Sequence, residues 1–456
     1  MMSVSGIRPL FAGVSRRWLS AQAAAQATRE TQPLPKQDAQ VSKLGSGLTV
    51  ASLENYSPIS RIGVVVNAGP RHETTDNLGI SHCLRSFADL STKHATGFAI
   101  TRGLEDVAAS LETSTTREHQ IYTVRCMRDA VDTGVHYLNT ITNGQEFRRW
   151  ELRENKGRLT FDLATIKDQL PLRVMDDVHS AAFRETLGRS AYAPEYMIGN
   201  HSTDMLLEYV QQHYTAGNMA LVGVGVDHSE LTKLAEQFEA RTGSGAVKQA
   251  ATFTGGAELR NQCGGDFSLA AVAVEGCASG SKDALALGIL QHMMGAGPYI
   301  KWGSNQAASK LTQGAGKATS LPFSASCFNL AYSDAGAFGV FAVANAEDMD
   351  GVLKGMMKEF GAVTKGNISS KDFERAKNQF KAAVLMNSEN QDTLFEDLAV
   401  QALNLGSYSS PADLAQQIDS ITADDTLKLA KKVFNGKPCM AASGNLGQTP
   451  YMDQLM

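Results

Sequence analysis

The chain carries the same order of local sequence patterns twice, and this internal repeat limits the possible folds more than any other feature. A β-branched run at residues 61–66 is followed by a glycine turn and by a segment near 77–89 in which a helix is expected. A second strand-like run at residues 268–274 is likewise followed by a glycine and by a helical run at 284–294. The strand–turn–helix order therefore occurs once in each half of the chain.

The spacing between equivalent positions indicates a duplication. Gly69 and Gly276, which follow the two strand runs, lie 207 positions apart. Ser202 and Thr422 each open an amphipathic helical run, and they lie 220 positions apart. The larger second offset indicates a few insertions in the second half. A repeat this much longer than the roughly 20–50 residues of a solenoid predicts two duplicated domains.

We therefore expect an α+β fold built from two homologous α/β domains. The chain has 456 residues, of which 43% are hydrophobic and 20% charged, as is typical of soluble globular proteins. We place the N-terminal domain at 41–241, a glycine- and alanine-rich linker at 242–265, and the C-terminal domain at 266–456. Long amphipathic helices are expected at 147–168 and at 369–386, the latter opening with a capping-box pattern.

The first 29 residues have the composition of an organellar transit peptide. They contain four arginines, interspersed serines and no acidic residue. The run Arg17–Ser20 resembles a matrix-protease site, so we expect cleavage after Leu19. Residues 1–19 would then be a mitochondrial transit peptide and residues 20–40 a flexible lead-in. A disordered tail without a targeting role is the alternative.

Charge, cysteine content and hydropathy argue against several classes of protein. The formal net charge is −5, whereas nucleic-acid-binding domains usually carry a basic excess. The six cysteines form no Cys-x-x-Cys pair, so we expect reduced thiols, with a zinc ribbon or a redox dithiol as the alternative. No run of roughly 18 apolar residues predicts a transmembrane helix, so membrane contact is expected only through partners.

The segment 78–87, in the helix expected after the first strand run, points to a specific chemistry. It contains Gly79 and His82 in the order Gly-x-x-His. Here the sequence resembles the inverted-zincin peptidases (peptidase family M16), whose zinc-binding helix carries Gly-x-x-His-x-x-Glu-His. Two histidines four positions apart on a helix face the same side and can bind one zinc ion. The resemblance extends over about 400 residues, from Leu44 to near the C-terminus, and implies two M16-type domains.

The resemblance also implies a role for each position of the motif, and this chain departs from most of them. His82 matches the first histidine of the family. Arg85 stands where the family has the glutamate that activates the zinc-bound water, and Ser86 stands where it has the second histidine. The third family ligand is a distal glutamate expected near 161–163, where Asp162 is the only carboxylate.

These substitutions are incompatible with zinc-dependent hydrolysis. Arginine is never deprotonated at ordinary pH, so Arg85 cannot be a general base, and its charge repels a dication. The hydroxyl of Ser86 is a poor zinc ligand. Loss of a general base alone typically lowers the rate about 100- to 10,000-fold. We therefore expect no catalytic residue and no bound metal, with His82 a surface or cleft histidine. The equivalent second-half helix carries His292 but no carboxylate.

Combined with the transit peptide, the resemblance implies a non-catalytic core subunit of the mitochondrial ubiquinol–cytochrome c reductase, respiratory complex III. Such a subunit is a scaffold on the matrix side of the inner membrane. The implied partners are core subunit 1, cytochrome b, cytochrome c1, the Rieske iron–sulfur protein and small subunits, within a dimeric complex. No cofactor is expected in this chain, because haem and the iron–sulfur centre belong to partner subunits.

Two alternatives from the same family remain. The first is an α-type substrate-recognition subunit of the mitochondrial processing peptidase. Such subunits carry a long glycine-rich loop in the second half, whereas the corresponding stretch here, 294–299, is short. The second is an active metallopeptidase, which the residues at positions 85 and 86 argue against.

Overall fold

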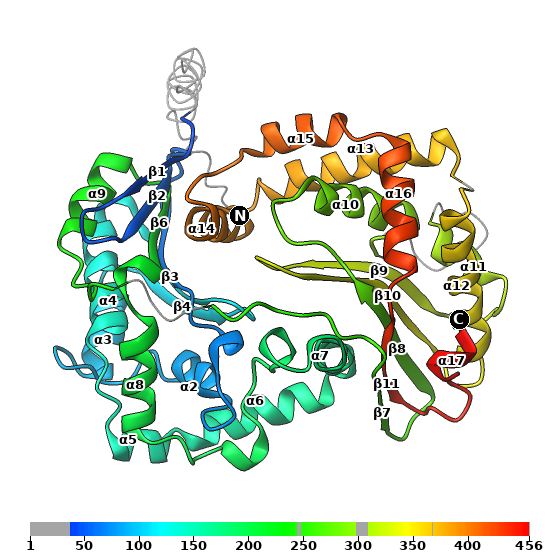
Figure 1. Cartoon of the computed structure of the whole chain (residues 1–456). Coiled ribbons are helices and arrows are strands. Elements are labelled where there is room, and N and C mark those ends of the chain that lie inside the picture. The colour runs from blue at the N-terminus through cyan, green and yellow to red at the C-terminus, as the bar shows by residue number, and fades with distance from the viewer. Residues whose placement is uncertain (1–36, 244–247, 298–308, 367, 456) are drawn as a thin grey trace, which may run out of the picture. The chain divides into compact units, whose positions relative to one another are not determined.

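The computed structural model of the protein describes residues 37–243, 248–297, 309–366 and 368–455 (Figure 1). The predicted transit peptide lies outside the described residues, as do most of the predicted lead-in and the stretch that follows Gly297. Residues 38–456 group into one compact unit.

Six strands from the first half of the chain form one mixed sheet. These strands are β1 (Gln40–Lys43), β2 (Thr49–Leu53), β3 (Ile59–Val66), β4 (Ser110–Thr115), β5 (Gln120–Met127) and β6 (Met219–Val224). Their order in the sheet is β1-β2-β6-β3-β5-β4, and only β2 and β6 pair in parallel. The central strand β3 is buried on both faces, which explains why its residues 62–66 form a continuous apolar run.

Five strands from the second half form a second sheet. They are β7 (Glu258–Gln262), β8 (Phe267–Glu275), β9 (Ser324–Ala331), β10 (Gly336–Asn345) and β11 (Cys439–Gly444). Their order, β7-β11-β8-β10-β9, repeats that of the first sheet without β1, including one parallel pair at the same place, β7 with β11. The predicted α+β duplication is therefore confirmed at the level of sheet topology.

Helices fill the connections between these strands. In the first half they are α2 (Ile80–Ser86), α3 (Gly97–Asp106), α4 (Val131–Asn143), α5 (Arg149–Glu154), α6 (Lys156–Asp168), α7 (Leu170–Phe183), α8 (Thr203–His213) and α9 (His228–Glu236). In the second half they are α10 (Lys282–Met294), α11 (Lys310–Gly316), α12 (Met349–Thr364), α13 (Ser370–Asn387), α14 (Gln391–Leu405), α15 (Pro411–Asp419), α16 (Ala423–Phe434) and α17 (Met452–Leu455). Among the described residues, no helix is both long and apolar enough to cross a membrane.

The two helix starts predicted from Ser202 and Thr422 are confirmed. The Ser202 hydroxyl accepts the backbone N–H of Met205 at the start of α8, and the Thr422 hydroxyl accepts that of Asp425 at the start of α16. At Thr422 the reciprocal bond from the backbone to the Asp425 carboxylate completes a capping box. The capping-box pattern at Ser369 marks the correct helix start, but its side chain forms no capping bond.

The structure corrects three details of the sequence analysis. Residues 258–262, inside the predicted linker, form β7 and pair with β11, so the stretch without regular structure is shorter than expected. The helix expected near 77–89 is confined to the seven residues of α2. The single helix expected at 147–168 is two helices, α5 and α6, with Asn155 between them.

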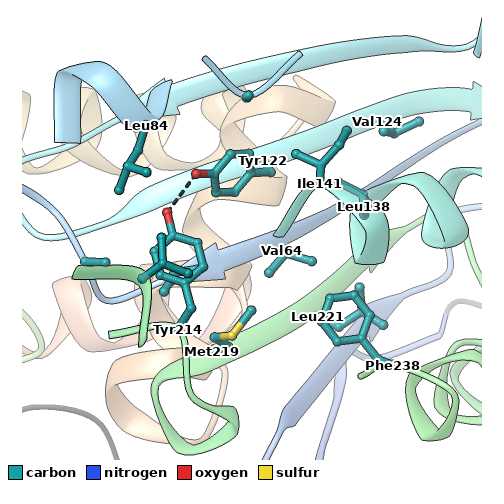
Figure 2. Packing of buried hydrophobic residues seen from close by; sticks show 14 of the residues in the cluster. Val64, Leu84, Tyr122, Val124, Leu138, Ile141, Tyr214, Met219, Leu221 and Phe238 are labelled. Carbon is teal, nitrogen blue, oxygen red and sulfur yellow. Dashed lines mark hydrogen bonds between the residues drawn. The ribbon is translucent and has the colours of Figure 1, made fainter. Parts of the chain in front are cut away.

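One face of the first sheet carries the main core of the first half. Val64 and Leu221 from the sheet pack against Leu138 and other apolar side chains of α4, α8 and α9 (Figure 2). Two tyrosines of this core, Tyr122 and Tyr214, share a hydrogen bond of 2.7 Å between their hydroxyls, so neither of these buried hydroxyls lacks a partner.

The opposite face of each sheet is covered by a helix from the other half of the chain. Helix α14 packs on β6, β2 and β3, where the fully buried ring of Phe395 lies over Gly63, whose hydrogen side chain leaves it room. Helix α7 packs on β11 and β8, with Val178 and Phe183 in that interface. In Figure 1, α14 lies beside the first sheet and α7 beside the second. This exchange of helices joins the two halves.

A buried ion-pair network also joins the halves. The Arg71 guanidinium, whose side chain is 1% exposed, bonds the carboxylates of Glu118 at 2.8 Å and Asp334 at 2.7 Å. Lys248 and Ser333 also donate to Glu118. Burial opposes ionisation of Glu118, but these donors more than offset it and lower its pKa to about 2. The turn after β3 is thereby fixed to the β9–β10 turn of the second half.

Candidate functional site

The helix α2 carries the motif positions, and its N-terminus is held by a buried carboxylate. Gly79 precedes the helix at a φ of +82°, and an added Cβ there would lie 2.3 Å from Cα of Ala193, so only glycine fits. Glu73 accepts the backbone N–H groups of Gly79 at 2.7 Å and of Ser81 at 3.0 Å. Burial raises the pKa of Glu73 to about 7. Sequence analysis missed this residue, because a cap six positions before the helix follows no short motif.

His82 is fully buried, so the expected surface position is wrong. Its Nδ1 accepts the backbone N–H of Ala193 at 3.2 Å, and its Nε2 lies 3.1 Å from Oδ2 of Asp162. Because Nδ1 is an acceptor, the ring proton resides on Nε2 and is donated to Asp162. Burial lowers the pKa of His82 to about 4, although the hydrogen bond to Asp162 opposes this shift. The imidazole is therefore neutral at pH 7.

Asp162 brings all the motif positions together. Nη2 of Arg85 lies 3.2 Å and Oγ of Ser86 lies 3.5 Å from the same Oδ2 that accepts from His82. The Arg85 guanidinium also lies over the ring of Tyr192, 5.0 Å from its centroid. Asp162, the only carboxylate at 161–163, thus lies within 3.5 Å of the side chains of all three motif positions on α2.

We call this arrangement a closed ion-pair site, because its charged and polar side chains already bond one another. The Arg85 cation compensates the Asp162 charge, and the site has one imidazole and one carboxylate as conventional metal ligands. No group of three or more His, Cys, Asp or Glu side chains in the described part of the chain could hold a metal ion. Neither Arg85 nor the neutral His82, whose free nitrogen lone pair is bound to a backbone amide, can activate a water molecule here.

The site borders an open pocket of about 500 Å3. Its lining includes Arg85, Ser86, Asp162 and Phe161, the last of which is 72% exposed. Arg158, also in the lining, pairs with Asp89 at 2.8 Å. The pocket therefore offers a polar surface on which the positive groups are already paired.

Cys83 faces away from this site, as its position next to His82 predicted. Its thiol lies 3.3 Å from Nδ1 of His201, whose Nε2 lies 2.9 Å from the backbone carbonyl oxygen of Leu78. Burial raises the pKa of Cys83 and lowers that of His201, so the pair is a neutral hydrogen bond at pH 7 rather than an activated thiolate. The separation of 118 positions along the chain explains why sequence analysis did not find this pair.

The equivalent helix of the second half holds no comparable site. Nδ1 of His292 on α10 lies 2.9 Å from the carbonyl oxygen of Gly288 in the same helix, and its ring lies against Phe380. His292 therefore has a local packing role.

Comparisons with known proteins agree with the geometry. The model of the insulinase family (peptidase family M16) matches residues 49–195, and that of the peptidase M16 inactive domain matches residues 200–380. The mitochondrial cytochrome b-c1 complex subunit 2 of Homo sapiens is 42% identical over 424 residues, covering 93% of each chain, and the Mus musculus protein has the same identity and coverage. A probable mitochondrial-processing peptidase subunit beta of Arabidopsis thaliana is 28% identical over 91% of this chain and 80% of that protein. The duplicated fold, the motif helix and these matches together place the chain in peptidase family M16, to which it belongs.

Proposed function

We propose that the chain is a non-catalytic scaffold subunit of mitochondrial respiratory complex III. The observation that carries this proposal is the 42% identity, over 93% of both chains, to proteins named cytochrome b-c1 complex subunit 2. An identity of this extent covers both domains and the surfaces between them. The proposal includes a position on the matrix side of the inner membrane, with core subunit 1, cytochrome b, cytochrome c1 and the Rieske protein as partners.

We propose further that the motif positions His82, Arg85 and Ser86 are the remnant of a peptidase zinc site. The convergence of all three on Asp162 supports this assignment, because the family resemblance assigns these positions to zinc binding and water activation, and they lie together around one carboxylate. The chain would then bind neither zinc nor haem, and the redox centres of the complex would lie in its partners.

We also propose that residues 1–19 are removed on import, that 20–40 lead into the fold, and that 41–241 and 266–456 are the two domains. The strand β7 belongs with the second of these because it pairs with β11. N-terminal sequencing of the mature chain tests the first point. We expect it to begin at Ser20, and an intact Met1 would contradict the transit peptide.

An α-type subunit of the mitochondrial processing peptidase is the second candidate. It is favoured only by weaker similarity, such as 27% identity to the alpha subunit of Solanum tuberosum over 91% of this chain. The two candidates predict that the chain belongs to different assemblies, a haem-containing membrane complex or a soluble peptidase heterodimer.

The test is mild detergent extraction of mitochondria, native gel separation, and detection of this chain beside a haem stain. Co-migration with a haem-containing complex is expected. Migration as a small soluble heterodimer that cleaves presequence peptides would overturn the scaffold proposal in favour of the processing peptidase.

A further inference from the structure

A basic pocket lies between α5, α6 and the N-terminus of α8. It encloses about 370 Å3, and its lining includes Arg149 and Arg153 of α5, Lys156 of α6, and Ser202 and Thr203 at the start of α8. The neutral Cys83–His201 pair also lines it. The lining contains three cationic side chains and no carboxylate, although the whole chain has a net charge of −5.

The three cations lie on one side of the α5–α6 segment. Arg149 and Arg153 are four positions apart on α5, a spacing that places side chains next to each other on a helix, and Lys156, the first residue of α6, lines the same pocket. Like charges at this spacing repel. No ion pair joins any of the three to a carboxylate within the described ranges. By contrast, both arginines that line the pocket beside Asp162 are paired: Arg85 with Asp162 and Arg158 with Asp89.

The opposite wall adds further positive potential. Helix α8 has 11 residues, and its first turn opens toward the pocket at Ser202 and Thr203. The Ser202 hydroxyl satisfies the amide of Met205, while no acceptor for the amides of Thr203 and Asp204 exists among the residues that the structure describes. The Asp204 side chain is not part of the lining. Helix N-termini with free amides favour anions.

The backbone beside the pocket leaves space for one of the cations. Gly199 has a φ of +87°, and a Cβ added there would lie 2.8 Å from Nζ of Lys156. Glycine at this position therefore allows the ammonium group to lie against the loop before α8. Three cations without carboxylate partners, a concave surface and free helix amides would together complement one compact, multiply charged anion.

We propose that this pocket binds a phosphate group. Guanidinium groups form paired hydrogen bonds to phosphate oxygens, and a lysine adds a point charge. The phosphate would belong either to the phosphomonoester headgroup of phosphatidic acid or to a free phosphate compound, because both present the same tetrahedral group with up to two negative charges. This inference does not depend on the proposed scaffold role.

The test compares the full mature chain with the variant R149Q/R153Q/K156Q. Inorganic phosphate is titrated at constant ionic strength while the melting temperature is followed, and flotation measures binding to phosphatidylcholine vesicles with and without phosphatidic acid. We expect phosphate to raise the melting temperature of the unaltered chain and the variant to bind about tenfold more weakly. Additional binding to phosphatidic acid vesicles, lost in the variant, would identify the source as a lipid headgroup.

A matched control removes the same charge elsewhere. The variant K282Q/K428Q/K432Q alters a second pocket of about 420 Å3 whose lysines share the lining with Asp283 and Asp425, and we expect it to bind phosphate like the unaltered chain. All substituted residues are exposed, and melting without phosphate verifies that each variant folds. Equal phosphate and vesicle binding by all three proteins, or no binding by the unaltered chain, would overturn the proposal.

Discussion

Nε2 of His82 lies 3.1 Å from Oδ2 of Asp162, although 80 residues separate the two in the chain. The family motif places a zinc ion between these two positions. In this protein the two side chains bond directly, and the Arg85 guanidinium supplies the positive charge. Helices α2 and α6 therefore converge at the positions that the family resemblance assigns to the zinc site.

This geometry predicts that zinc binding can be rebuilt. The variant R85E/S86H supplies the missing helix residues but leaves Asp162, which is one methylene shorter than the family glutamate. We expect R85E/S86H/D162E to bind stoichiometric zinc, measured by elemental analysis after dialysis, and the double variant to bind it at least about tenfold more weakly.

Adding H82A to the triple variant is the control, and it should abolish the zinc. Robust peptidase turnover by the double variant alone would show that the third ligand is not at position 162. Stoichiometric zinc in the unaltered chain that is lost in H82A would contradict the closed ion-pair site itself.

Buried histidines make the protein sensitive to mild acid. Burial lowers the pKa of His82 and His213 to about 4, and that of His72 and His179 to about 3. In the unfolded chain these histidines bind a proton near pH 6.5, whereas in the folded chain they remain neutral to a lower pH. The folded state therefore has its full stability above pH 6.5 and loses stability as the pH falls toward 4. The expected loss is on the order of 2 kcal/mol per histidine at pH 5, measured by urea unfolding.

His213 offers a direct check of this pH dependence. Its Nδ1 has no hydrogen-bond partner among the described residues, and its ring lies against Tyr209, so H213F preserves the packing without the titration. We expect the slope of unfolding free energy against pH between 5 and 6.5 to decrease by up to about 1.4 kcal/mol per pH unit. The exposed His94 is the control, and H94F should leave the slope unchanged. Equal slopes in H213F and the unaltered chain would refute the assignment.

The exchanged helix α14 should contribute strongly to stability. Phe395 is fully buried between this helix and the first sheet, so F395A removes a large ring from a packed interface. We expect a loss of about 3–5 kcal/mol in the free energy of unfolding. F98A, at a position 77% exposed, should change it by no more than about 0.5 kcal/mol. A small effect of F395A in chemical denaturation would mean that α14 does not dock on the sheet.

We expect the ion-pair network around Arg71 to stabilise the contact between the two halves of the chain. R71M leaves Glu118 and Asp334 without their shared guanidinium, and removing one partner from a buried ion pair typically costs about 3–5 kcal/mol. R158M, which removes an exposed pair with Asp89, should cost less than about 1 kcal/mol. Urea unfolding of both variants measures these losses. Similar losses in both variants would argue against a special role for Arg71.

Much of the local structure could be predicted from neighbouring residues. The β-branched run at 61–66 and the caps Ser202 and Thr422 depend on side-chain period and on hydrogen bonds within one helical turn, so a few adjacent residues determine them. The spacing between repeated positions predicted the two-domain fold. The motif residues His82 and Arg85 were identified because a zinc helix requires fixed spacing.

The remaining features depend on packing between distant segments. No local pattern shows that α14 covers the first sheet, that Glu73 caps α2, or that Cys83 meets His201, because each contact joins elements positioned by both sheets. The sequence by itself determined the main strand runs, the helix caps and the duplication, since these depend on residue type and on spacing along the chain. Only the tertiary structure decided that Arg85 and His82 share Asp162 and that the halves exchange helices, since burial and the distance between side chains arise only when the whole chain packs.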